Sequence, residues 1–304
     1  MLCSLWIGSC QPNATTQSPA MNRDGKPDVV TTSTIITDWT QQIAGDRATV
    51  IGILKPGDDP HIYEPVPADS RSLEEAELIL YNGYNLEPNI IKLINAAGIS
   101  AHKVAVGEVI APLQLNDRQR GVVPDPHVWG SAKNAIVMVA LIRDELIRLS
   151  PSDKTTFSHN AEVLIRELER LHQWIPQQIQ TIPTQQRQLV TTHDAFQYYA
   201  NTYGLKVAGT LIGISTEEQP SAQTVQQLAE SIRQLGVPTI FAETTINPRL
   251  ITTVAEAAQV KLATPPLYSD SIGAPGSPGD TYINMMVVNT RTIVKNLGGQ
   301  VTPF

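Results

Sequence analysis

Three histidines lie where predicted strands end or predicted helices begin. His61 follows the strand TVIGIL through the segment GDDPHIYEPVP, and His193 lies between the strand RQLVTT and the helix DAFQYYANTYG. His127, in VVPDPHVWG, directly precedes a long predicted helix. Imidazole is the commonest ligand for divalent transition metals, and open parallel sheets bind their ligands at these strand ends. The three side chains therefore predict a metal site that forms only when distant parts of the chain fold together.

A carboxylate is expected to complete this donor set. Asp270, in the irregular segment PPLYSDSIGAPGSPGD, is the candidate. The alternative is that the four residues are scattered over the surface, and their spacing alone leaves both interpretations open. The remaining histidines lie on predicted strands or helices and are interpreted as partly exposed polar residues: His102, His159 and His172.

The residues around His61 and His127 predict how these side chains are supported. Pro60 and Pro65 restrict the backbone beside His61, so its imidazole loses little conformational freedom on binding an ion. Glu64 and Asp125 are candidates to accept a hydrogen bond from the second nitrogen of a ligand histidine. The alternative is that both are solvated charges of their loops.

Strand and helix patterns alternate along most of the chain. DVVTTST, RATVIGIL, AELILYNG and AHKVAVGE are strand-like and are separated by helical patterns, and the alternation resumes with RQLVTT, KVAGTL and PTIFAET. Such repetition is typical of parallel sheets covered by helices. The predicted fold class is α/β, with two lobes, each a mainly parallel sheet flanked by helices, joined by one long rigid connector helix. The predicted parts are residues 1–28 (signal remnant and disordered tether), 29–152 (N-terminal lobe), 153–183 (connector helix) and 184–304 (C-terminal lobe).

The connector helix is predicted from a long stretch with apolar residues on one face. It begins after Asp153 and continues to Ile175, which corresponds to roughly 35 Å at 1.5 Å per residue. Pro176 and Pro183 predict its end. The helix before it, SAKNAIVMVALIRDELIRLS, has Ser131 at the position of a capping side chain.

Composition excludes several classes of protein. The formal charge of −7 and the lack of a basic run argue against nucleic-acid binding. No stretch approaches the roughly 20 apolar residues of a membrane-spanning helix. Cys3 and Cys10 are the only cysteines, so the rest of the chain has neither a disulfide nor a thiolate metal site.

The first residues of the chain resemble a bacterial lipoprotein signal. A short apolar stretch ends in IGSC, which is similar to a lipoprotein cleavage site with Cys10 as the lipidated residue. About twenty polar residues follow and are typical of a disordered tether. A lipidated cysteine carrying several acyl chains would anchor the chain firmly to a membrane. The alternative is an ordinary frayed terminus.

Five motifs occur in an order that resembles a known family. HIYEP, DPHVW, THDAF, ETTINPRL and LYSDSIG…GDTYINMM are similar to segments of the zinc/manganese solute-binding proteins of bacterial metal ABC transporters. The resemblance runs from about Val29 to the end of the chain. It implies two α/β lobes bridged by a rigid helix, and it implies that one Zn²⁺ or Mn²⁺ is bound per chain by His61, His127, His193 and Asp270. It also implies a monomer that is not an enzyme, that lies in the periplasm or on the outer face of the cytoplasmic membrane, and that delivers its metal to a membrane permease.

The choice between zinc and manganese depends on two departures from the family pattern. Many zinc-specific members carry a histidine-rich insertion before the second ligand, and GEVIAPLQLNDRQRGVVPDPH has no histidine before His127. Many manganese members carry Glu where this chain has His193. Three neutral imidazoles and one carboxylate favour Zn²⁺ over Mn²⁺ on raw affinity. Zinc is therefore the favoured cargo, with manganese close behind.

Two other functions use the same residues. A zinc hydrolase would need a general base near the metal-bound water, for which Glu64 or Asp194 is available, but the chain has no HExxH, GxSxG or Walker motif. An adhesin role has no support in any residue.

For the binding protein, a long connector helix would resist wide hinge motion. Metal release is then expected to need local movement of the loop after Asp270, because GAPGSPG is flexible in composition.

Overall fold

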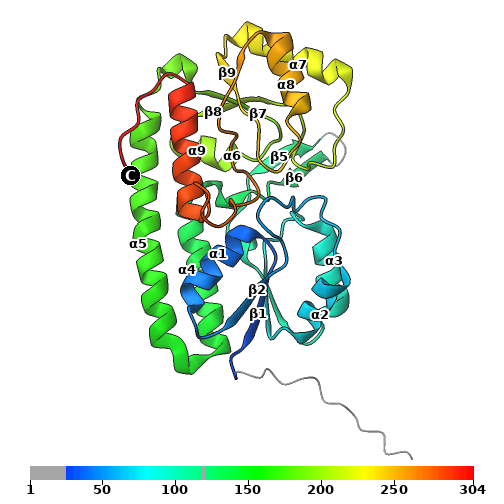
Figure 1. The fold of residues 1–304 in the computed structure, drawn as a ribbon, viewed down its shortest axis with the longest axis vertical. Coiled ribbons are helices and arrows are strands. Elements are labelled where there is room, and N and C mark those ends of the chain that lie inside the picture. Colours follow the sequence, from blue (N-terminus) through cyan, green and yellow to red (C-terminus); the bar gives the residue numbers. More distant parts are fainter. Residues whose placement is uncertain (1–24, 118–120) are drawn as a thin grey trace, which may run out of the picture.

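The computed structural model describes residues 25–117 and 121–304, which form two α/β lobes joined by a long helix (Figure 1). This arrangement confirms the predicted fold class. Most of the predicted signal remnant and tether, including Cys10, lies outside the described residues. Within the described residues, no helix is both long enough and apolar enough to span a membrane.

A four-stranded parallel sheet forms the centre of the first lobe. Its strands, in spatial order, are β2 (Thr49–Gly52), β1 (Asp28–Thr31), β3 (Leu78–Tyr81) and β4 (His102–Ala105). Its helices are α1 (Thr34–Ala44), α2 (Pro67–Glu75), α3 (Pro88–Ala97) and α4 (Ala132–Leu149). Successive residues of β1 face opposite layers: Val29 packs with α1 and α4, whereas Val30 packs with α2 and α3 (Figure 1). Because both faces are covered, the central strands are continuous apolar runs.

The second lobe has a sheet made of two strand pairs. Its strands are β7 (Gln188–Thr191) with β8 (Lys206–Thr210), and β9 (Thr239–Ile240) with β10 (Lys261–Leu262), each pair parallel. Its helices are α6 (Gln197–Tyr203), α7 (Ala222–Leu235), α8 (Arg249–Ala258) and α9 (Tyr282–Asn296). Single parallel bridges, Thr191 with Phe241 and Glu243 with Leu267, continue the sheet between and beyond these pairs. The ladder of this lobe is therefore less continuous than that of the first.

Helix α5 (Lys154–Ile179) runs along one side of both lobes (Figure 1). Its 26 residues correspond to a length of about 39 Å. The helix continues past its predicted last residue, Ile175, and through Pro176 for one more turn. A proline removes one N–H donor, but its carbonyl still accepts a hydrogen bond from Gln180 N at 2.9 Å, which closes the last turn.

The start of α4 differs from the prediction in how it is capped. Ser131 occupies the N-cap position, but its side chain makes no capping hydrogen bond to the helix. The backbone N–H of Ala132 instead donates to Tyr203 Oη, at the end of α6, at 3.0 Å. A side chain from the second lobe thus satisfies the N-terminus of a helix that follows the first lobe in sequence.

Several short elements were not predicted. An antiparallel hairpin of β5 (Gln114–Asp117) and β6 (Gly121–Pro124) precedes His127. Helix α2 was also missed, since its sequence PADSRSLEE carries few apolar residues. Short 3₁₀ helices occur at Val106–Val109, Val128–Gly130, Pro151–Asp153 and Thr184–Gln186.

The largest hydrophobic cluster extends through both lobes. It contains Val29 and Leu80 from the first sheet, Leu189 and Phe241 from the second, and Leu171 from α5. The residue limits predicted for the two lobes remain a prediction. The two lobes share this largest cluster, and each also has a smaller cluster of its own.

Candidate metal centre

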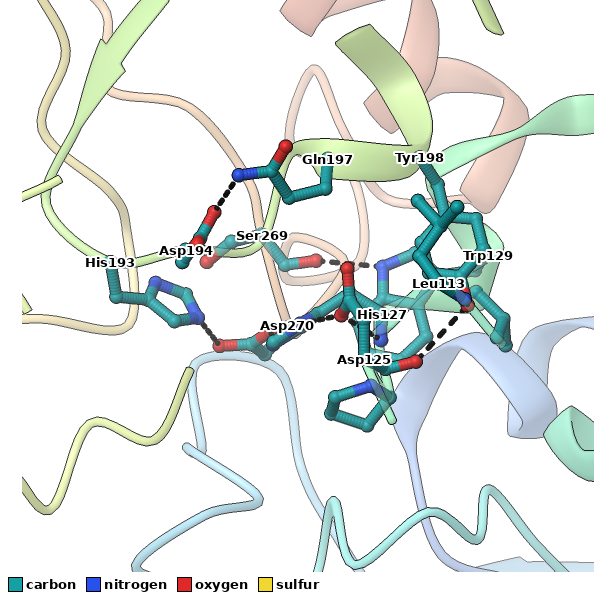
Figure 2. Close-up of polar contacts among 12 residues, drawn as sticks. Leu113, Asp125, His127, Trp129, His193, Asp194, Gln197, Tyr198, Ser269 and Asp270 are labelled. Carbon is teal, nitrogen blue, oxygen red and sulfur yellow. Dashed lines mark hydrogen bonds and ion pairs between the residues drawn. The ribbon is translucent and has the colours of Figure 1, made fainter. Parts of the chain in front are cut away.

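The structure brings the four predicted ligand residues together between the lobes. Each offers one donor atom, and the four atoms all lie within 4.8 Å of one another with every side chain buried. His61 Nε2 lies 3.3 Å from His127 Nε2. The Asp270 carboxylate lies between two imidazoles, with Oδ1 3.4 Å from His127 Nε2 and Oδ2 3.1 Å from His193 Nε2 (Figure 2). A group of three nitrogens and one carboxylate at this spacing is suited to a single divalent ion.

Four separate loops carry these residues to one place. His61 lies on the long loop after β2, and His193 lies two residues after β7. His127 lies between β6 and the 3₁₀ helix before α4, and Asp270 follows the isolated bridge at Leu267. Three of these segments follow parallel strands or a parallel bridge, as ligand-binding loops of open α/β sheets do.

A buried carboxylate accompanies His127 on the side away from the centre. Asp125 Oδ1 lies 2.7 Å from His127 Nδ1 and also accepts a hydrogen bond from His127 N at 3.0 Å (Figure 2). With the proton held on Nδ1, the lone pair of Nε2 faces the centre. The predicted proximity of Asp125 to a ligand histidine is thus present in the structure.

A matching carboxylate at His193 was not predicted. Glu243 Oε2 lies 2.5 Å from His193 Nδ1, and Glu243 Oε1 accepts a hydrogen bond from His193 N at 2.9 Å. Glu243 belongs to the segment ETTINPRL and lies three residues after β9, at the end of the strand-like run PTIFAET, which is the sequence signal that could have identified it. It orients His193 as Asp125 orients His127.

Two other predicted residues lie elsewhere. Glu64 is exposed and accepts a hydrogen bond from Asn89 Nδ2 at 3.2 Å. Asp194 accepts a hydrogen bond from Gln197 Nε2 at 2.7 Å (Figure 2). Burial raises the pKa of Asp194 above its usual value.

The buried charges at the centre favour a cation. Burial opposes ionisation of Asp270, but His193, His127 and His61 hold the pKa of its carboxyl well below its usual range. Burial lowers the pKa of His193, yet Glu243 and Asp270 together raise it well above its usual value. Without a metal, these carboxylates therefore hold a proton on His193, and a divalent ion would replace that proton.

The second lobe also holds the segment that carries His127. Tyr198 Oη donates to Asp125 O at 3.2 Å and accepts from Leu113 N at 2.9 Å (Figure 2). Trp129 Nε1 donates to Ser269 O at 3.0 Å, next to Asp270. The segments that carry His127 and Asp270 are thereby connected to each other.

A cavity of about 920 Å³ lies beside the centre and is lined by residues of both lobes. Of the four candidate ligands, His61 is the one that lines it. Carboxylates from the two lobes also line this cavity, namely Glu64, Glu108, Glu217 and Glu218. Such a lining attracts cations toward the His61 side of the centre.

Comparisons with known proteins agree with this geometry. Residues 29–296 match the family described as zinc-uptake complex component A, periplasmic. The chain is 33% identical over 270 residues to the manganese-binding lipoprotein MntA of Halalkalibacterium halodurans, covering 88% of each chain. It is 32% identical over 290 residues to the metal ABC transporter substrate-binding lipoprotein FimA of Streptococcus parasanguinis, covering 93% of each.

Solved structures show the same fold. The periplasmic zinc-binding protein TroA of Treponema pallidum superposes with a TM-score of 0.84 at 34% identity, covering 90% of this chain and 99% of TroA. A manganese-bound mutant of the periplasmic metal-binding protein of Candidatus Liberibacter asiaticus superposes with a TM-score of 0.79 at 27% identity, covering 89% of this chain and 99% of the mutant.

Proposed function

Because the chain belongs to the family of the periplasmic zinc-uptake component A, we propose that it captures a divalent transition metal between its lobes and delivers it to an ABC permease. Proteins of this family are solute-binding components of metal transporters and not enzymes. His61, His127, His193 and Asp270 are the proposed ligands of the transported ion.

One observation carries this proposal. Four buried donor atoms, from four loops and both lobes, lie within 4.8 Å of one another. Scattered surface residues would be neither buried nor convergent. Four protein donors can fill a tetrahedral site and leave no position for a reacting water, which is typical of binding rather than catalysis. The candidate bases of the hydrolase alternative, Glu64 and Asp194, are hydrogen-bonded to amide side chains instead.

Zn²⁺ is the favoured cargo and Mn²⁺ is the close alternative. Three imidazoles and one carboxylate form a nitrogen-rich donor set, for which Zn²⁺ has the higher intrinsic affinity. Relatives of the chain are named for both metals, with TroA described as zinc-binding and MntA as manganese-binding. The ion is cargo that must be released to the permease, so its rate of release matters as much as the affinity of the protein for it.

The chain is proposed to act as a monomer outside the cytoplasm. One chain supplies all four donors, so the centre needs no second copy. Cys10 is proposed to carry a lipid anchor on the outer face of the cytoplasmic membrane, as the lipoprotein names of MntA and FimA suggest by analogy. The periplasm is the compartment proposed where a second membrane is present.

Metal analysis tests this function directly. Protein purified without an affinity tag or chelator is expected to contain one Zn²⁺ or Mn²⁺ per chain, and competition between the two should favour Zn²⁺. His127→Ala is expected to abolish this stoichiometric binding. Wild-type protein that binds neither ion tightly would contradict the proposal, and tight Mn²⁺ binding in the presence of equal Zn²⁺ would overturn the metal preference.

A further inference from the structure

The segment Asn82–Asn89 follows β3, includes the first two residues of α3, and lies beside both histidine loops of the first lobe. Asn82 is completely buried at the end of β3. Its backbone N donates to Glu87 Oε1 at 2.7 Å, and its carbonyl accepts from Gly107 N at 2.9 Å. A Cβ at Gly107 would lie 2.7 Å from that carbonyl, so glycine is needed for this close approach. The position of Asn82 is thus determined from both sides.

The side-chain amide of Asn82 reaches the segment that carries His127. Nδ2 donates to Gly83 O at 3.1 Å and to Pro126 O at 3.0 Å. Both neighbours are acceptors, which determines the orientation of the amide. Among the described residues, this is the hydrogen bond that ties residues 125–129 to the end of a strand in the first sheet.

The bond to Pro126 O acts directly on the backbone of His127. Pro126 O and His127 N belong to one planar peptide unit, so holding the oxygen also holds the nitrogen. Asp125 Oδ1 accepts from His127 N on the other side of this unit. Asn82 and Asp125 together therefore fix the position of the His127 backbone, from which the imidazole projects.

A second asparagine of the segment contacts the loop that carries His61. Asn89 Nδ2 donates to Tyr63 O at 3.3 Å and to Glu64 Oε1 at 3.2 Å. The Tyr63 carbonyl lies two residues after His61. The two ends of the segment thus each hold one histidine loop, although the Asn89 bonds are longer and nearer to solvent than those of Asn82.

The backbone of the segment is strained between these two residues. Gly83, Tyr84 and Asn85 have φ values of 85°, 50° and 58°. Glycine adopts such values freely and asparagine more readily than most residues, so the strain lies at Tyr84. Tyr84 N donates to Glu108 Oε1 at 3.1 Å, and Tyr84 Oη donates to Ile110 O at 2.7 Å. These bonds from the neighbouring β4 side maintain the strained turn.

The segment also contains a buried carboxylic acid, Glu87, whose removal from water is unfavourable. Glu87 is completely buried, and burial raises its pKa to about 7 even though Asn82 N and Thr32 Oγ1 donate to it. Strain and a buried carboxyl at one turn are typical of a segment retained for a geometric role. Neither feature is needed merely to join a strand to a helix.

We propose that Asn82 is a positioning residue that, with Asn89, sets the distance between the imidazoles of His61 and His127. This inference rests on the proposed function, because it assigns the residues that hold two of the metal ligands at the right distance from each other. The 3.3 Å between the two Nε2 atoms is then a property of the Asn82–Asn89 segment as well as of the two loops. The effect of Asn82 should exceed that of Asn89, since its bonds are fully buried.

The test compares three asparagine sites in the full chain. Asn82→Ala and the isosteric Asn82→Asp remove the donors to Pro126 O, and Asn89→Ala removes the donor to Tyr63 O. Asn160→Ala is the matched control, because Asn160 Nδ2 also donates to one carbonyl, Ile43 O at 3.0 Å, but on α5. The measurements are the rate at which Zn²⁺ passes to excess chelator and the visible absorption spectrum of the Co²⁺-loaded protein.

We expect Asn82→Ala to release Zn²⁺ about tenfold faster, as changes in residues that orient ligands commonly do. Asn82→Asp should behave similarly, Asn89→Ala should show a smaller increase, and Asn160→Ala should match wild type. The Co²⁺ spectrum should change in the Asn82 variants, which a loss of stability alone would not cause. Should the Asn82 variants not fold, Asn89→Ala must still release Zn²⁺ faster than Asn160→Ala.

Wild-type release rates and spectra in the folded Asn82 variants would overturn the positioning role. That result would leave the proposed function intact, provided that wild type binds one ion and His127→Ala does not. If wild type binds no ion, the proposed function fails instead. The two failures are therefore distinguishable.

Discussion

The two lobes hold their metal ligands in different ways. The first lobe has a continuous four-stranded sheet, and the His127 segment is held by Asn82 and Asp125 of this lobe and by Tyr198 of the second lobe. The second lobe has strand pairs joined by single bridges, and the ring of His193 is oriented by Glu243. Each histidine has one supporting carboxylate, but the segment of His127 also has neutral contacts and should tolerate the loss of one member better than His193 tolerates the loss of Glu243. We therefore expect substitutions that remove a charge to lower metal affinity more in the second lobe than in the first.

Removing one ligand from each lobe should have the largest effect. His61→Ala and His193→Ala are each expected to lower Zn²⁺ affinity by more than about 100-fold, beyond the range for residues that only orient ligands. Competition with a chromophoric chelator measures this loss, and His159→Ala on the exposed face of α5 is the control. Near-wild-type affinity in His193→Ala would show that His193 is not a ligand.

Changing the carboxylate that supports each histidine should lower Zn²⁺ affinity more in the second lobe than in the first. Glu243→Gln is expected to lower Zn²⁺ affinity by up to about 100-fold, and Asp125→Asn by only about tenfold. Glu243 uses both oxygens on His193, whereas the backbone beside His127 keeps two hydrogen bonds when Asp125 is changed, from Asn82 to Pro126 O and from Tyr198 to Asp125 O. The same chelator competition applies. Equal losses in the two variants would refute the difference between the lobes.

Acid should weaken metal binding, beginning above the pKa of free imidazole. The pKa of His193 is raised well above its usual value of about 6.5 because Glu243 and Asp270 outweigh the effect of burial. Below that raised pKa, Zn²⁺ must displace one proton, so affinity should fall about tenfold for each pH unit as pH decreases. Titrations between pH 9 and pH 6 measure this slope. Glu243→Gln should move the onset to lower pH, and an unchanged onset would show that Glu243 does not hold the proton.

The hydrogen bond between the lobes at Ser271 should have the smallest effect. Ser271 Oγ accepts from Gly57 N at 2.9 Å, so it joins the segment after Asp270 to the loop of His61. Ser271→Ala should remove about 1 kcal/mol and speed Zn²⁺ release by roughly fivefold. Stopped-flow release measures this change, with the surface variant Ser70→Ala as control. An unchanged rate would argue against movement of the Asp270 loop as the step that frees the metal.

Much of the centre could be predicted from the sequence because its residues follow strand ends. His61 and His193 each come after an apolar run, and such runs predict strands whose carboxyl ends share one edge. The identity of the fourth donor, Asp270, depended on its place in a loop without regular structure. The positions alone left convergence open, and it was the resemblance to the metal-binding family that implied it. Neither predicts the distances between donors.

The supporting contacts could not be predicted, because they depend on side-chain orientation. Glu243 contacts a histidine 50 positions earlier, and no local pattern relates the two. The cap of α4 is supplied by Tyr203, so the local signal of Ser131 was misleading. The hairpin before His127 was missed because LQLND and GVVP are too short for a clear period of two.

The shared hydrophobic cluster determines how the molecule should lose its structure. Leu171 of α5 belongs to the same cluster as residues of both sheets, so we expect the two lobes to unfold together. Calorimetry should therefore record a single endotherm, and bound ion should shift that whole peak upward rather than split it. The chain, on this view, gains its capacity to bind metal in one step, when the shared cluster forms.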